Sequence, residues 1–207
     1  EAMSVFIRSL AIGLGIGFII ILMQYPIGEL AFKFIKSGPE SVNHVKTYFR
    51  IVIWGAPAVL GMYAFKGWFI GMQNARIPMV IAILNNILNI VLSVCFVFGL
   101  GMSIALGTTL SQIISLIVAA ILWHKYYGRL RKYIQKDKIW KRQVIREYFR
   151  VNGDIFVRTF LLTLVTTFFT FASSGMGDTI LAINALLMQF FMLFSYFMDG
   201  FAYAGEA

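Results

Sequence analysis

The chain has 207 residues, of which 59% are hydrophobic and only 13% are charged, and its formal net charge is +9. Soluble globular domains carry about 25% charged residues, so this composition excludes that class and is typical of a polytopic membrane protein. The positive charge does not indicate a nucleic-acid partner, because it is concentrated in one segment between hydrophobic stretches.

Intervals without charge predict six transmembrane helices, because a helix needs about 20 apolar residues to cross the hydrocarbon core. The predicted spans are 9–28, 45–70, two spans within 77–124 that turn near 98–103, 159–177 and 179–198. Arg50 and Lys66 lie near the ends of the second span, where long side chains can carry their charge to the membrane surface. We therefore expect an all-α, polytopic membrane helix bundle.

Small residues and a proline are expected to shape the first two spans. Gly13 and Gly17 have the G-x-x-x-G spacing that allows two helices to approach closely. Pro57 lies inside the second span and should kink it. A broken helix lines a cavity in many transporters, but a tolerated kink in a packed helix explains the proline equally well.

A basic segment divides the spans into two groups. Residues 125–150 contain ten Lys and Arg but only two acidic residues, Asp137 and Glu147. The positive-inside rule places this segment, and with it the N-terminal Arg8, on the cytoplasmic side. Its apolar residues recur at helix-like intervals, which predicts an amphipathic helix against anionic lipid. We predict four membrane helices in 1–124, a basic cytoplasmic loop in 125–153, and two membrane helices in 154–207.

Carboxamide and hydroxyl side chains interrupt the third and fourth spans. The candidates for a polar cavity on these spans are Asn85, Asn86, Asn89, Ser93, Thr108 and Gln112. Asn85 and Asn89 are four residues apart and share one helix face. An unpaired amide that faces lipid is costly, so these side chains must face protein or water. Two interpretations stay open, namely hydrogen bonds between helices and the lining of a substrate or cation cavity.

The last span adds further polar groups. Asn184 and Gln189 lie within it, and Asp199 lies at or just inside its membrane boundary. A carboxyl group in a low-dielectric site can bind and release protons, whereas the same group at the interface has no such role. The sequence has no nucleotide-binding loop, metal-ligand spacing or nucleophilic serine motif, so we expect neither an enzyme nor a cofactor.

Several stretches resemble one family of membrane proteins. They are "GWFIGMQNARIP" (67–78), "NILNIVLSVCFVFGLGM" (86–102), "LGT" (106–108) and the closing "GDTILAINALLMQFFMLFSYFMDGFAYAGEA" (177–207). They are similar to the multidrug and toxic compound extrusion (MATE) transporters, and the closing stretch resembles the bacterial branch named for DNA damage-inducible protein F (DinF). Family members have about twelve helices in two lobes. The chain resembles helices three to eight, so we expect a fragment whose remaining helices are partners of these six.

The resemblance implies a function and a set of site residues. It implies efflux of organic cations or other xenobiotics in exchange for Na⁺ or H⁺, by alternating access of two lobes in the bacterial inner membrane. It also implies that Asn89 and Thr108 line a polar cavity, with a Na⁺ near this pair as the only metal expectation. The family usually has Asp at the position of Ser93, so this chain lacks one candidate ion ligand.

Two other functions compete with efflux. A lipid-linked saccharide flippase of the related superfamily would be expected to carry a strongly cationic cavity for pyrophosphate, and these spans contain few Lys and Arg. A membrane scaffold without transport would have no polar cavity. Its packing would leave no accessible space beside Asn85, Asn89 and Gln112.

Overall fold

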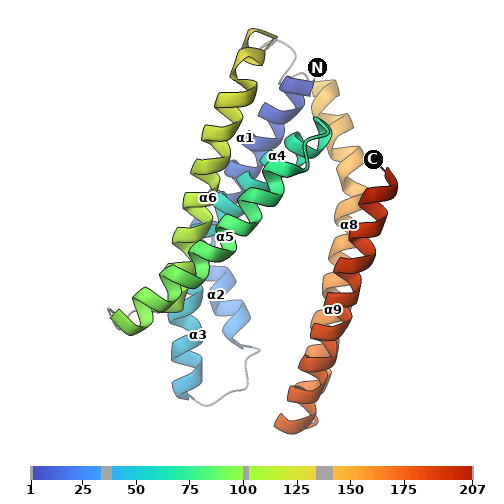
Figure 1. Ribbon diagram of the computed structural model, residues 1–207. Coiled ribbons are helices and arrows are strands. Elements are labelled where there is room, and N and C mark those ends of the chain that lie inside the picture. The colour runs from blue at the N-terminus through green and yellow to red at the C-terminus, as the bar shows by residue number, and fades with distance from the viewer. Residues whose placement is uncertain (1, 34–38, 100–102, 134–141, 207) are drawn as a thin grey trace. The chain divides into compact units, whose positions relative to one another are not determined.

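The computed structural model describes residues 2–33, 39–99, 103–133 and 142–206, which form helices and no strands (Figure 1). The elements are α1 (Ala2–Leu22), α2 (Gln24–Lys33), α3 (Pro39–Val52), η1 (Ile53–Gly55), α4 (Ala56–Gly71), α5 (Arg76–Val94), η2 (Cys95–Gly99), α6 (Ile104–Tyr127), η3 (Gly128–Tyr133), α8 (Arg142–Ser174) and α9 (Asp178–Glu206). The predicted all-α class is confirmed.

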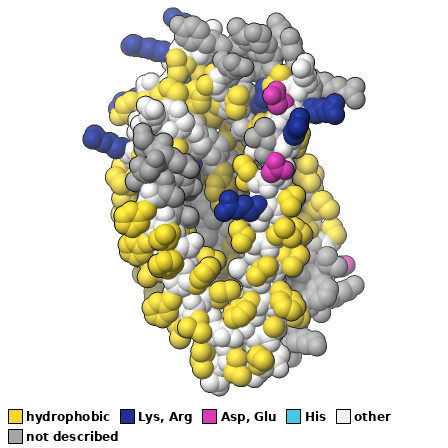
Figure 2. Space-filling view, turned by 90° about the vertical axis from the view of Figure 1, so that its right-hand side faces the viewer, with side chains coloured by type: hydrophobic (Ala, Val, Ile, Leu, Met, Phe, Trp, Pro, Cys, Tyr) yellow, Lys and Arg dark blue, Asp and Glu magenta, His cyan; other side chains and the backbone are white. Residues whose placement is uncertain are grey.

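Six helical segments are long and apolar enough to cross a membrane, as the charge-free intervals predicted. They are Ala2–Leu22, Val45–Gly71, Arg76–Gly99, Ile104–Lys132, Gln143–Ser173 and Thr179–Met198. Large apolar side chains point outward from them, including Leu22 at 81% exposure and Phe98 at 85%. Hydrophobic side chains are numerous among the coloured residues in the lower part of the face drawn in Figure 2.

The first span begins and ends earlier than the charge pattern predicted. It covers Ala2–Leu22, and the separate helix α2 follows from Gln24. Arg8, which the charge pattern placed just before the first span, therefore lies inside α1, where its side chain is only 3% exposed. The prediction failed because it treated every charge as a boundary, whereas a helix can carry a buried arginine that has protein contacts.

Two glycines bring α1 against α4, as their spacing predicted. A Cβ atom added to Gly13 would lie 3.1 Å from the Leu60 carbonyl oxygen, and one added to Gly17 would lie 2.5 Å from the Pro57 Cα. Larger side chains at either position would therefore separate the helices.

The second span is broken rather than merely bent. The 3₁₀ segment η1 separates α3 from α4, and Pro57 occupies the first turn of α4. Proline suits a helical first turn because its missing N–H has no acceptor there. The sequence predicted a kink at Pro57, and the structure has a 3₁₀ segment just before the proline.

An aromatic cluster fixes one end of the first four spans. It joins Phe6 of α1, Phe65 and Trp68 of α4, and Trp123 of α6, all of them buried. The ring of Phe6 lies 5.1 Å from that of Trp123 and 5.2 Å from that of Phe65, measured between centroids. Packing of this kind is stronger than area alone suggests, so the cluster holds α1, α4 and α6 in register.

The chain forms two compact units, Glu1–Trp140 and Lys141–Ala207, and each is described by itself. In the second unit α8 and α9 form a hairpin whose turn contains Gly177 at φ +104°. The helix α8 begins at Arg142, so the last residues of the predicted loop 125–153 form the first turns of a membrane helix. The basic residues of this segment therefore do not mark the start of the helix.

A candidate substrate cavity

The helices α5 and α6 are joined by two hydrogen bonds that involve predicted site residues, and Ser115 is a partner that the sequence did not predict. The Asn89 amide donates to the Thr108 hydroxyl at 3.2 Å, and the Ser115 hydroxyl donates to the Asn85 amide oxygen at 3.1 Å. Asn85 and Asn89 are one helical turn apart, so their shared face lies against α6. Asn85 and Asn89 thus form hydrogen bonds between helices, which is one of the two interpretations of the polar side chains.

A cavity of about 310 Å³ lies beside this contact, between α4, α5 and α6. It is lined by Ala58, Val59, Met62, Tyr63, Lys66, Ile81, Ala82, Asn85, Asn86, Gln112 and Ser115. Polar groups come from Asn85 and Asn86 on α5 and from Gln112 and Ser115 on α6, while α4 supplies apolar side chains together with Tyr63 and Lys66. Small-molecule sites commonly occupy about 300–1,000 Å³ and combine apolar walls with a few polar groups, as this cavity does.

The carboxamides therefore divide between the two interpretations. Asn85 bonds α6 and also lines the cavity, while Asn86 is exposed and lines it without a described hydrogen bond. Asn89 bonds Thr108 and is not among the cavity-lining residues. Hydrogen bonding between helices and lining of the cavity are therefore both present on α5, and Asn85 takes part in both.

Gln112 reaches the cavity because Gly55 leaves room for it. Its amide oxygen is buried without a hydrogen-bond partner among the described residues. This oxygen lies against Gly55 in η1, and a Cβ atom at position 55 would collide with it. The break in the second span therefore positions a polar side chain of α6.

Thr109 ties α6 to the same break. Its hydroxyl lies 3.3 Å from the Ile51 carbonyl oxygen and 2.9 Å from that of Ala105. A 3₁₀ segment interrupts the helical ladder and changes which carbonyls are bonded within the helix. The Thr109 hydroxyl of α6 therefore contacts a carbonyl oxygen in the last turn of α3, next to the 3₁₀ segment.

Ser93 packs between helices instead of lining the cavity. Its hydroxyl oxygen is buried with no hydrogen-bond partner in the described part of the chain. A Cβ atom on Gly107 of α6 would lie 2.6 Å from this oxygen, so α5 and α6 are in close contact there. At Ser93, the last residue of the predicted polar face, α5 and α6 therefore pack closely against each other.

Sequence reasoning missed Tyr63 and Lys66 as cavity residues. Lys66 was expected near the end of its span, but its side chain is half-buried and lines the cavity. Its ammonium lies 5.7 Å from the centre of the Tyr63 ring. The two residues are three apart and follow Val59 and Met62 on the same side of α4, and this spacing was the available signal.

The predicted residues of the last span belong to the second unit. The Asn184 amide donates to the Ser173 hydroxyl at 2.7 Å, which links α9 to α8 within the hairpin. Gln189 is exposed, and the side chain of Asp199 lies outside the described residues. Because the two units are separate, the cavity of the first unit is built without these side chains.

The described residues contain no group of three or more His, Cys, Asp or Glu that could hold a metal ion. The expected Na⁺ near Asn89 and Thr108 would depend on neutral oxygens, so this finding does not test it.

The six apolar spans, together with a partly polar cavity between α4, α5 and α6, define the class of protein: a polytopic membrane helix bundle. Comparison with known proteins narrows the class. The MatE family profile matches residues 1–95. DNA damage-inducible protein F of Escherichia coli strain K12 is 32% identical over 204 residues, which are 97% of this chain and 44% of that protein.

Plant proteins are also similar. Protein DETOXIFICATION 42 of Arabidopsis thaliana is 26% identical over 179 residues, 86% of this chain and 34% of that protein. The chloroplastic Protein DETOXIFICATION 45 of the same plant is 26% identical over 198 residues, 96% of this chain and 35% of that protein. No solved structure matches the chain. The chain spans less than half the length of these curated relatives.

The chain is similar to the MatE family, whose members are transporters and not enzymes. The family resemblance and the multi-pass membrane character that the sequence predicted are both confirmed.

Proposed function

We propose that this protein is an efflux antiporter that exports organic cations and other xenobiotics in exchange for Na⁺ or H⁺. The observation that carries the proposal is the cavity of about 310 Å³ beside Asn85, Asn86 and Gln112 in the middle of the apolar spans. Polar groups inside a membrane bundle are expensive, and they are kept where a substrate or ion passes. The similarity to the MatE family supports the transport class.

The proposed mechanism is alternating access between two lobes in the bacterial inner membrane. The first unit would supply four helices of one lobe, and the second unit would supply two helices of the other. The basic segment 125–153 would connect them on the cytoplasmic side, where Lys and Arg are enriched and anionic lipid is the partner.

We propose two groups for the coupling ion. Asn89 and Thr108 are in hydrogen-bond contact, and their oxygens could enter the ligand shell of a Na⁺. Asp199 would instead bind a proton if its carboxyl group lies in a low-dielectric environment. Gln189 and Asn184 lie on the same helix as Asp199 and complete the proposed polar set of the second unit.

The competing functions fit the cavity less well. A flippase for pyrophosphate-linked saccharides needs several cations, and Lys66 is the one charged side chain among the cavity-lining residues named above. A scaffold without transport requires packed carboxamides with no accessible space, whereas Asn85 and Gln112 line a cavity.

Ethidium efflux from vesicles that contain the full-length protein tests the proposal. We expect efflux when an inward Na⁺ or H⁺ gradient is imposed and none when both gradients are collapsed. Applying the two gradients separately identifies the coupling ion. If no gradient drives efflux across a panel of organic cations, the antiport proposal is wrong.

A further inference from the structure

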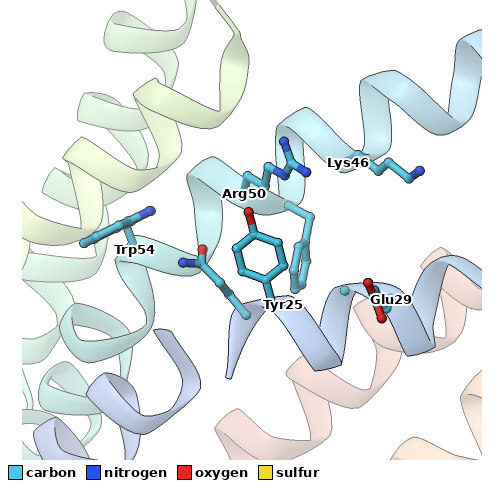
Figure 3. A pocket seen from close by; sticks show the side chains of 8 residues that line it. Tyr25, Glu29, Lys46, Arg50 and Trp54 are labelled. Carbon is cyan, nitrogen blue, oxygen red and sulfur yellow. The ribbon is translucent and has the colours of Figure 1, made fainter. Parts of the chain in front are cut away.

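A second and larger cavity, of about 760 Å³, lies between α2 and α3. Its walls include Tyr25 and Glu29 of α2, Lys46 and Arg50 of α3, and Trp54 of η1 (Figure 3). None of the residues lining it lines the carboxamide cavity. It is therefore a separate site, and neither the transport proposal nor the polar face of α5 accounts for it.

This cavity lies at the membrane boundary. The span in α1 ends at Leu22, immediately before α2, and the next span begins at Val45, beside Lys46. Tyr25 is 74% exposed and Trp54 is 58% exposed, although both are large aromatic residues. Tyr25 lies three residues beyond the end of the first span, and an exposed Tyr at such a position is typical of the lipid headgroup level, where one end of the ring is apolar and the other is wet.

The charges of the cavity come from two facing helices. Lys46, Arg50 and Trp54 follow one another at intervals of four residues, so they lie along one side of the second span. Tyr25 and Glu29 have the same interval on α2. In Figure 3 the Tyr25 ring points from α2 toward α3, the helix that carries both cations. Glu29 lies on the same helix as Tyr25.

We propose that this cavity binds the headgroup of a zwitterionic phospholipid that carries a phosphate and a primary amine. Arg50 and Lys46 bind the phosphate, because guanidinium and ammonium groups form strong charge-assisted hydrogen bonds with phosphate oxygens. Glu29 binds the amine. Tyr25 and Trp54 contact the glycerol region and the first methylene groups of the chains.

The mixed charge selects this headgroup over simpler ones. A lipid with only an anionic group would gain from Lys46 and Arg50 but would meet the repulsion of Glu29. A purely cationic amphiphile would meet the opposite conflict with two positive groups. A headgroup with both signs satisfies all three side chains, and its acyl chains can remain in the bilayer beside the spans.

Native mass spectrometry of the detergent-purified, full-length protein tests the proposal. The probes are phosphatidylethanolamine and phosphatidylglycerol with identical acyl chains, titrated separately and in competition. We expect phosphatidylethanolamine to bind more tightly than phosphatidylglycerol, and Lys46→Gln/Arg50→Gln to weaken its binding at least about tenfold. The matched control Lys125→Gln/Arg129→Gln removes two exposed cations with the same spacing and should change affinity less than about twofold.

The variant Glu29→Gln separates a specific site from a damaged fold. It should bring the two lipid affinities together while phosphatidylglycerol binding stays the same or rises, which misfolding cannot produce. Equal losses in the two double variants, or an unchanged lipid preference in Glu29→Gln, would overturn the proposal. Displacement of the lipid by equimolar inorganic phosphate or phosphoethanolamine would assign the site to a free phosphate compound and likewise overturn it.

Discussion

At the scale of single residues, neighbouring carboxamides on α5 have different contacts. The Asn89 amide donates a hydrogen bond to the Thr108 hydroxyl, whereas Asn86 is exposed and lines the cavity. The sequence predicted that this face is polar and faces protein or water. It could not separate the two roles, because they depend on where α4 leaves space beside α5.

Substituting these two asparagines by alanine should affect stability differently. Asn86→Ala should lower transport with little effect on the free energy of unfolding, because it removes only a cavity contact. Asn89→Ala should destabilise the protein by about 0.6 kcal/mol, the usual value of one hydrogen bond between membrane helices. Transport assays and thermal unfolding of the two variants check this, and equal losses of transport and stability in both would refute the division.

Lys66 should weaken the binding of cationic substrates in the proposed cavity. A unit charge about 8 Å from the substrate at an effective dielectric constant of about 40 contributes roughly 1 kcal/mol. Lys66→Met should therefore raise the apparent affinity for ethidium about fivefold and leave a neutral substrate unaffected. Lys125 is a matched control, because its ammonium lies 5.8 Å from the Tyr126 ring centre but outside the cavity. A similar change in Lys125→Met would contradict a local effect of Lys66.

At the scale of elements, the break in the second span connects packing to the cavity. Gly17 contacts the break at Pro57, and Gly55 leaves room for the Gln112 amide oxygen. Pro57 was enough to predict the interruption. Its partner on α6 could not be predicted, because that contact joins positions far apart in the sequence.

A double-mutant cycle tests the contact between Gly55 and Gln112. Gly55→Ala should destabilise the protein, because the new Cβ atom collides with the Gln112 side chain. In a Gln112→Ala background the collision is absent, so the same substitution should cost at least about 1 kcal/mol less. Thermal unfolding of the four proteins gives the coupling, and additive effects would show that the two residues do not interact.

The helix boundaries show where charge patterns fail as a guide. The spans Val45–Gly71, Arg76–Gly99 and Thr179–Met198 match their charge-free intervals closely. In contrast, α1 includes Arg8, and α8 begins at Arg142 inside the basic segment. Charges locate the membrane surface, while hydrogen bonding decides where a helix starts. The two boundaries coincide only where a turn lies at the surface, as between α4 and α5, where Gln73 has φ +56°.

At the scale of the whole molecule, the basic segment sets the proposed orientation. The helix α8 has 33 residues, a length of roughly 50 Å, so it is long enough to place its two ends on opposite sides of a hydrocarbon core about 30 Å thick. The sequence predicted this arrangement from the unequal distribution of Lys and Arg, which needs no knowledge of helix packing.

Cysteine labelling tests the orientation in a Cys95→Ser background. Gln143→Cys should react with a membrane-impermeant maleimide only from the cytoplasmic side. Met176→Cys, in the turn between α8 and α9, should react only from the outside; both native side chains are exposed. Reaction of Gln143→Cys from the outside would invert the proposed topology.

The central claim is that Asn86 faces a water-accessible cavity inside the membrane bundle. Asn86→Cys in the Cys95→Ser background can be treated with a charged, water-soluble methanethiosulfonate reagent, with Ile87→Cys as the neighbouring control that faces outward among apolar side chains. We predict that Asn86→Cys reacts and that ethidium slows its reaction, while Ile87→Cys stays unmodified because a thiol in lipid does not ionise. Equal, slow modification of both cysteines would contradict the cavity.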